Sequence, residues 1–123
     1  MEHSLALRLG KDGLAVRAAR VELRGWLEDT PCRPDCPDNV ELVVSELVTN
    51  ALIHTSTTAD LRATLTDRAV HIEVQDRAPA PPNMRETQGA AGGFGLHIVD
   101  AIAVDWGWRP TPDGKVVWAD VPL

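Results

Sequence analysis

The chain has 123 residues, a formal net charge of -6 and a sequence pI near 5.1, so we expect a single domain over residues 1–123. The acidic balance disfavours direct binding to nucleic acid, which requires clustered Lys and Arg, and leaves a protein or a small molecule as the expected partner. No apolar run reaches the roughly 18 residues of a membrane helix and the N-terminus lacks a secretion signal, so we expect a cytoplasmic protein with no membrane contact.

The first part of the chain predicts a strand followed by an amphipathic helix. Leucines at every second position of residues 5–9 indicate a half-buried strand. Apolar residues at near-helical spacing then run from Leu14 to Leu27 and indicate a helix packed on a sheet. The connection over residues 30–37 contains Cys32 and Cys36, which we interpret as reduced loop cysteines in a cytosolic setting.

The second predicted helix has the clearest pattern in the chain. Asp38 with Glu41 three residues later resembles a capping box, which predicts that the helix begins there. The apolar positions that follow form one stripe, and we expect the helix to run to about His54. The stripe consists of Val40, Val43, Val44, Leu47 and Ala51.

A hairpin and a long loop come next. Apolar and polar residues alternate over residues 61–65 and again over 70–75, which predicts two strands joined by a tight turn. Residues 77–94 are rich in Pro and Gly and lack periodicity. Long irregular loops inside small domains are usually functional or disordered, and we interpret this one as a lid.

A short helix and a final hairpin complete the predicted fold. The helix is expected over residues 96–102, and the apolar stretches 104–108 and 116–121 flank a Pro-Asp-Gly turn. Trp108 and Trp118 are expected to pair across this hairpin. Hairpin-linked strands with helices between them predict an α/β (α+β) two-layer sandwich, with a mostly antiparallel mixed sheet and its helices on one face.

Glu46 and Asn50 lie one turn apart on the second helix, at the margin of its apolar stripe. A carboxylate and a carboxamide at the edge of a core suit a magnesium-nucleotide site, because hard cations take oxygen ligands and a general base must reach an attacking hydroxyl. Taken alone, the two residues are better explained as a solvated helix edge.

Asp76 is singled out by strand parity. Counting by twos from Val70 through the strand reaches Asp76, so its carboxylate is expected to face inward with the apolar side chains. A buried carboxylate needs a donor, which a protein group or the amine of a bound adenine can supply. An Asp that starts the turn after the strand is the alternative interpretation.

The glycine turn Gly92–Leu96 directly precedes the last predicted helix. Glycines allow close approach of the backbone to a ligand, and the first turn of a helix offers unpaired N–H groups, so the segment is a candidate phosphate cradle. No Gly-Lys-Ser or Gly-Lys-Thr follows, which excludes the common P-loop. A hinge of the lid or a plain helix cap would have the same local sequence.

The order of these features resembles the superfamily of gyrase, histidine kinases and mismatch-repair MutL, known as GHKL or Bergerat-fold ATPases. Within it, the chain is most similar to small bacterial anti-sigma-factor serine/threonine kinases, whose pattern His54 also matches. The resemblance implies a general base at Glu46, a Mg²⁺ ligand at Asn50 and recognition of adenine by Asp76. It assigns further ATP contacts to Gly93, Gly95 and Leu96.

The resemblance also implies a function and partners. It predicts an ATP- and Mg²⁺-dependent kinase that sequesters a sigma factor, phosphorylates an antagonist protein and forms a homodimer. One departure supports a different class: the family usually has Asp-x-Gly-x-Gly where this chain has Asp76-Arg77-Ala78-Pro79-Ala80. The alternative is therefore a non-catalytic module of the same fold, either nucleotide-binding or a nucleotide-independent protein-interaction module. A histidine-kinase catalytic domain is less favoured, because no phosphoacceptor helix precedes it in this sequence.

Overall fold

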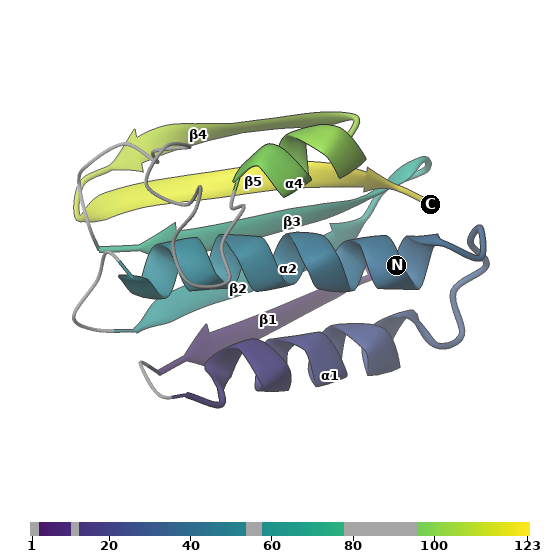
Figure 1. The fold of residues 1–123 in the computed structure, drawn as a ribbon, viewed down its shortest axis with the longest axis horizontal. Coiled ribbons are helices and arrows are strands. Elements are labelled where there is room, and N and C mark those ends of the chain that lie inside the picture. The colour runs from purple at the N-terminus through teal and green to yellow at the C-terminus, as the bar shows by residue number, and fades with distance from the viewer. Residues whose placement is uncertain (1–2, 11–12, 54–57, 78–95) are drawn as a thin grey trace.

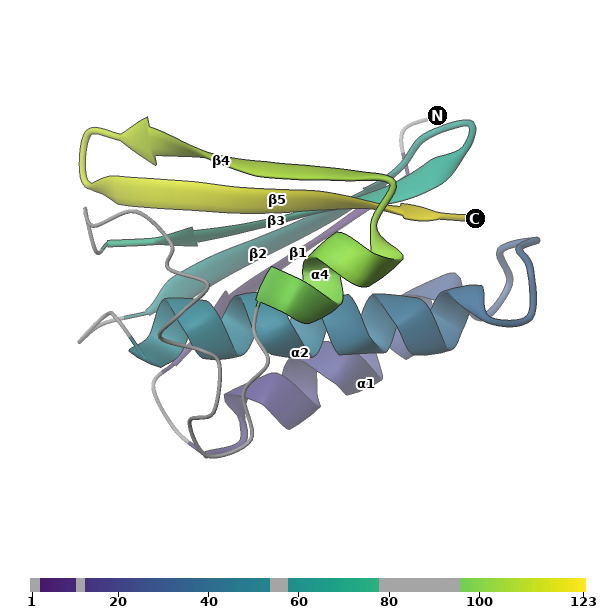
Figure 2. The same cartoon turned by 45° about the horizontal axis from the view of Figure 1, so that its top comes forward.

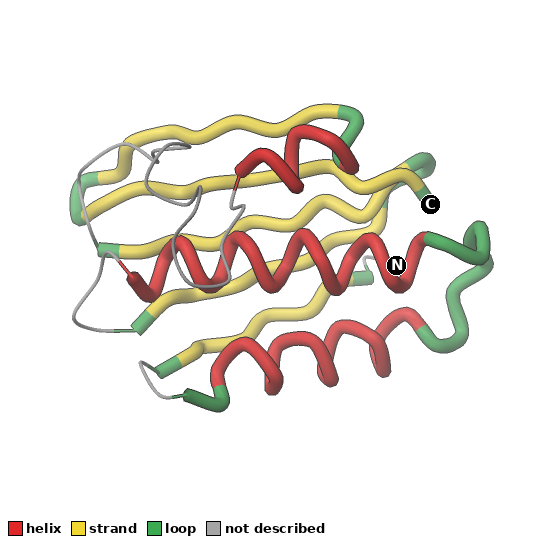
Figure 3. The backbone as a smooth tube through the Cα atoms, in the orientation of Figure 1, coloured by secondary structure: helices red, strands yellow, loops and turns green. Residues whose placement is uncertain are grey.

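A computed structural model describes residues 3–10, 13–53, 58–77 and 96–123. These residues form five strands and three helices, and Figures 1 and 3 show how they are arranged. The strands form one sheet in the order β1-β2-β3-β5-β4, and each neighbouring pair is antiparallel. In chain order the elements are β1 (Ser4–Leu9), α1 (Ala15–Leu27), α2 (Cys36–Ile53), β2 (Ala59–Leu65), β3 (Ala69–Asp76), α4 (Leu96–Ile102), β4 (Asp105–Thr111) and β5 (Gly114–Pro122).

The described helices cover one face of the sheet, as Figure 2 shows, so the predicted two-layer α+β sandwich is confirmed. Alternation along the strands creates this arrangement, because every second side chain of β2, β3 and β5 is buried against the helices. The helix α2 lies centrally, and five of its valine and leucine side chains are almost fully buried. These side chains are Val40, Val43, Val44, Leu47 and Val48.

The start of α2 differs from the sequence prediction. The helix begins at Cys36, and the backbone N–H of Asn39 already donates to the carbonyl of Asp35. Asp38 therefore lies within the first turn and does not cap the helix. Asp38 and Glu41 instead both accept hydrogen bonds from Arg24, which joins α2 to α1. The spacing identified an acidic pair correctly but could not reveal its partner on another helix.

The two cysteines are free thiols, in agreement with the sequence interpretation, although Cys36 is in the helix and not in the loop. Cys36 is fully buried. Burial, followed by the proximity of the Cys32 thiol, raises the pKa of Cys36 to about 12. A thiol with so high a pKa is a poor nucleophile near neutral pH, so Cys36 is a packing residue.

The register of the last hairpin is also different from the prediction. Trp118 lies opposite Gly107, and Trp108 lies opposite Val117 on the other face of the strand pair. A Cβ atom at position 107 would lie 3.0 Å from the Trp118 ring, so the glycine leaves room for the indole. The predicted pairing of Trp108 with Trp118 is therefore wrong. Trp118 stacks on His71, with ring centroids 5.7 Å apart.

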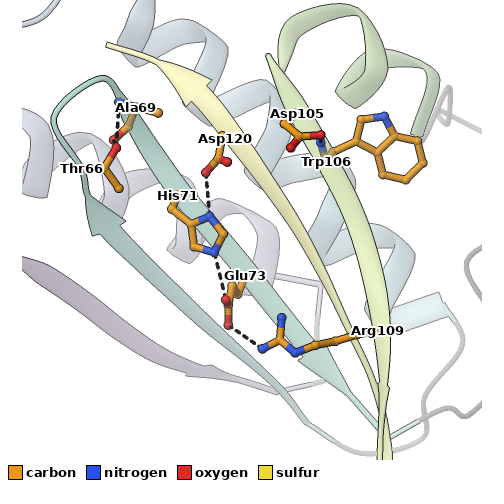
Figure 4. A network of polar contacts seen from close by, with 8 residues as sticks. All are labelled: Thr66, Ala69, His71, Glu73, Asp105, Trp106, Arg109 and Asp120. Atoms are coloured by element: carbon orange, nitrogen blue, oxygen red, sulfur yellow. Dashed lines mark hydrogen bonds and ion pairs between the residues drawn. The ribbon is translucent and has the colours of Figure 1, made fainter.

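A polar network joins three strands on the face of the sheet opposite the helices (Figure 4). The Nδ1 atom of His71 lies 2.6 Å from Asp120, and its Nε2 atom lies 2.9 Å from Glu73. Arg109 on β4 contacts the other oxygen of Glu73 at 3.4 Å. Burial alone would lower the pKa of His71, but the hydrogen bonds to Glu73 and Asp120 outweigh burial and raise this pKa.

We predict a pH dependence of stability from this network. The folded pKa of His71 lies above the unfolded value of about 6.5, so its stabilising contribution is full below that pH and is lost as the pH rises through the folded pKa. In urea unfolding measured from pH 5.5 to 9, the free energy of unfolding should therefore fall more steeply with pH in wild type than in His71→Asn. Glu73→Gln, which removes one of the two carboxylates, should show an intermediate slope. Equal slopes in wild type and His71→Asn would contradict the prediction.

Candidate functional site

Three elements bring their polar residues to the same end of the molecule. The C-terminal turns of α2, the end of β3 and the start of β5 lie together there, as Figures 1 and 2 both show. We call this region the site end. Asn50 comes from α2, Asp76 is the last residue of β3, and Lys115 is the second residue of β5.

Asn50 is buried without a hydrogen-bond partner. Its side chain is 2% exposed, and within the described part of the chain neither its Oδ1 nor its Nδ2 atom has a partner. Leaving a buried donor or acceptor unpaired costs about 1–3 kcal/mol. Glu46 lies one turn earlier on the same helix and is half-buried. A carboxamide in this state is suited to bind a molecule that completes its hydrogen bonds, or a metal ion that its oxygen coordinates.

Asp76 faces the core, as strand parity predicts. It is 1% exposed and continues the buried positions Val70, Ile72 and Val74 of β3. Its partner is Lys115, which lies directly opposite on β5 and is also 1% exposed. The Lys115 Nζ atom is 2.9 Å from one carboxylate oxygen and 3.2 Å from the other.

Sequence reasoning missed Lys115, although a signal for it exists. Counting by twos from Lys115 gives Val117, Ala119 and Val121, and all four side chains are buried. The same parity argument that placed Asp76 would have placed the ammonium on the inner face. Isolated buried charges are rare in proteins, so a lysine in such a series already indicates an acidic partner.

Gly114 fixes how closely β5 approaches the end of β3. A Cβ atom on Gly114 would overlap the backbone oxygen of Asp76 and the Cα atom of Arg77. Any larger residue would push the two strand ends apart. The glycine therefore holds the adjacent Lys115 at the distance at which it reaches Asp76.

The remaining predicted residues are only partly described. Leu96 is buried at the start of α4. Gly93, Gly95 and His54, with most of the predicted lid, lie outside the described residues.

The described residues contain no group of three or more His, Cys, Asp or Glu side chains that could hold a metal ion, so a dedicated metal cage is absent from that part. Mg²⁺ in nucleotide sites usually takes one or two protein oxygens, several waters and the phosphates. The unpaired Asn50 oxygen fits that requirement.

A groove on the opposite face of the sheet is a separate feature. It has a volume of about 480 Å³ and is lined by side chains that include Arg8, Arg62, Glu73 and Arg109. These charged side chains are exposed or half-buried, and the groove contains two ion pairs, Arg8–Asp60 and Arg109–Glu73. Solvated, mutually paired charges need no ligand, so the unpaired group at the site end is the stronger indication of function.

Comparisons with known proteins agree with the fold. A family described as histidine kinase-like ATPase domain matches residues 11–121. The chain is similar to the crystal structure of the RsbU and RsbW domains of Rv1364c from Mycobacterium tuberculosis, with a TM-score of 0.74 and 22% sequence identity. The match covers 96% of this chain and 32% of that one, so this chain spans about a third of its length. At this identity the likeness shows the fold alone. A comparison with curated protein sequences finds no match.

None of the helices in the described residues is long and apolar enough to cross a membrane.

We predict that the buried ion pair is a major structural contact. Lys115→Met should lower the free energy of unfolding by about 3–5 kcal/mol, because it leaves the Asp76 carboxylate buried without its opposite charge. Replacing both residues, with Asp76→Leu and Lys115→Met, should recover most of this loss. Urea unfolding of the single and double variants measures both effects.

The chain offers a matched control for this prediction. Arg8 and Asp60 also face each other across two neighbouring strands, 2.9 Å apart, but their side chains are 67% and 42% exposed. Arg8→Met should cost less than about 1 kcal/mol. If Lys115→Met lowered the free energy of unfolding no more than Arg8→Met does, the buried pair would contribute no more to stability than an exposed pair, and the prediction would be wrong.

Proposed function

Because the chain belongs to the histidine kinase-like ATPase domain family, we propose that it binds Mg-ATP at the site end. The observation that carries this proposal is the buried Asn50 carboxamide, whose two polar atoms have no partner in the described residues. Buried polar side-chain atoms are nearly always paired, so this carboxamide calls for a partner, and a bound nucleotide with its metal can supply one.

We assign the predicted residues these roles. Asn50 would hold Mg²⁺, which neutralises charge on the phosphates when it is bound. Asp76 would accept a hydrogen bond from the base. Glu46, which is half-buried and lies one turn before Asn50, would accept the proton of a substrate hydroxyl. The ATP contacts proposed for Gly93, Gly95 and Leu96 would lie where the chain enters α4.

The proposed reaction is transfer of the γ-phosphoryl group to a serine or threonine. The substrate oxygen forms a bond to the γ-phosphorus, the bond to the β-phosphate oxygen breaks, ADP leaves, and the hydroxyl proton passes to Glu46. Positioning and charge neutralisation supply most of the catalysis in such reactions.

We propose that the substrate is an antagonist protein and that a sigma factor is the sequestered partner. We further propose that the protein acts as a cytoplasmic homodimer. The likeness of the fold to a structure that contains an RsbW domain supports this choice.

One observation supports a second candidate, a non-catalytic interaction module. Asp76 is already engaged by Lys115, and the residues after it are Arg77-Ala78-Pro79-Ala80 in place of the usual glycines. In this alternative the fold presents a protein-binding surface whose shape does not depend on turnover. Calorimetry at millimolar Mg-ATP separates the two candidates, because a pure interaction module gives no heat of nucleotide binding.

Two variants test the proposed roles. Asn50→Leu should weaken Mg-ATP binding at least about tenfold while the free protein stays as stable as wild type, because an unsatisfied amide is replaced by an apolar group of similar size. Glu46→Gln should keep Mg-ATP affinity within about threefold but slow phosphoryl transfer by roughly 100-fold or more. Calorimetry, urea unfolding and transfer of labelled γ-phosphate to antagonist proteins of the same organism provide the measurements. Unchanged Mg-ATP affinity in Asn50→Leu would rule out the proposed site.

A further inference from the structure

We propose that Lys115 and Asp76 together read the nucleobase, and that this pair admits guanine and other 6-oxopurines as well as adenine. The inference rests on the nucleotide site proposed above. It concerns a residue, Lys115, that the site residues predicted from the sequence do not include. It makes Lys115 a determinant of base specificity.

The geometry places a donor and an acceptor side by side. The Lys115 Nζ atom lies 2.9 and 3.2 Å from the two oxygens of Asp76. The two residues face each other in the β3–β5 register, and Gly114 holds the strands close at this point. A ligand that reaches the Asp76 carboxylate therefore also meets the ammonium group.

In the pose in which position 6 of the base meets Asp76, a carboxylate alone would favour adenine. An ionised carboxylate offers only acceptor atoms, so it can take a hydrogen bond from the 6-amino group of adenine. Guanine has an oxygen at the same position, and two acceptors facing each other repel. In that pose an Asp without a neighbouring donor would face O6 of a 6-oxopurine and disfavour it, because buried polar groups left unpaired are costly.

The ammonium group changes this pattern. With guanine, the N1–H and the 2-amino group can donate to Asp76 while O6 accepts from the Lys115 Nζ atom. With adenine, the 6-amino group can donate to Asp76 while N1 accepts from Nζ. In each case the base replaces one of the Nζ–carboxylate contacts with a contact of its own, so both charged groups keep hydrogen-bond partners.

Burial makes the pair a fixed part of the site. Both side chains are 1% exposed, so the ammonium cannot simply turn into solvent when a base enters. The Arg8–Asp60 pair on the opposite face shows the contrast, since its exposed guanidinium can exchange its partner for water. Electrostatic discrimination between bases is also stronger in a desolvated setting.

The test compares nucleotides and variants by calorimetry. For wild type, the dissociation constants of Mg-ATP and Mg-GTP should agree within about tenfold. Lys115→Met should weaken Mg-GTP at least about tenfold more than it weakens Mg-ATP, because O6 of guanine then faces the Asp76 carboxylate, whereas adenine loses only the contact to N1. Mg-ITP has O6 and N1–H but no 2-amino group, and its dissociation constant should respond to Lys115→Met as that of Mg-GTP does. The Lys115→Arg variant keeps a donor and should retain binding of both 6-oxopurine nucleotides.

The outcomes separate this inference from the proposed function. Wild type that binds Mg-ATP but rejects Mg-GTP more than about a hundredfold would overturn the inference and leave the nucleotide site standing. A Lys115→Met variant that weakens both nucleotides equally would show a purely structural lysine and overturn it as well. Absence of binding by either nucleotide would overturn the proposed function and the inference together. If Lys115→Met does not fold, the wild-type ratio and the Lys115→Arg variant still decide.

Discussion

The buried ion pair between Asp76 and Lys115 is the contact on which the site end depends. Two opposite charges, each 1% exposed, meet across neighbouring strands at the place where the chain leaves β3 and enters β5. Burying either charge alone would be costly, so each residue makes the position of the other possible. Gly114 is needed for the same reason, because only a residue without Cβ lets the two strand ends approach this closely.

Whether a buried polar side chain has a hydrogen-bond partner distinguishes the structural polar residues of this molecule from those of the proposed site. The network of His71, Glu73 and Asp120 on the outer face is well paired and partly solvated, and it joins strands without needing a ligand. Asn50 is the opposite case: it is buried, and its carboxamide is unpaired within the described residues. Because α2 carries Asn50 to the same end as Asp76, an unsatisfied group and a charged donor–acceptor pair come from different elements to one place.

Local patterns predicted the elements well, and strand parity predicted that Asp76 faces the core. Contacts between residues of different helices and strands were harder to predict from the sequence. The capping-box pattern at Asp38 was misleading because its partner, Arg24, comes from another helix. The tryptophan pairing failed because the register of the β4–β5 hairpin places Gly107 opposite Trp118. Lys115 was open to the same parity reasoning as Asp76, but a single charged residue beside a turn is usually solvated.

The most direct test of the site end is the NMR response of its side chains to Mg-ATP. In protein labelled with ¹⁵N, the side-chain amide signals of Asn50 should shift as Mg-ATP is added, because the nucleotide and its metal provide the partners that this carboxamide lacks. The ring signals of His71, on the opposite face, should stay in place. Saturation by Mg-ATP with unchanged Asn50 signals and shifted His71 signals would place the nucleotide on the outer groove and contradict the account.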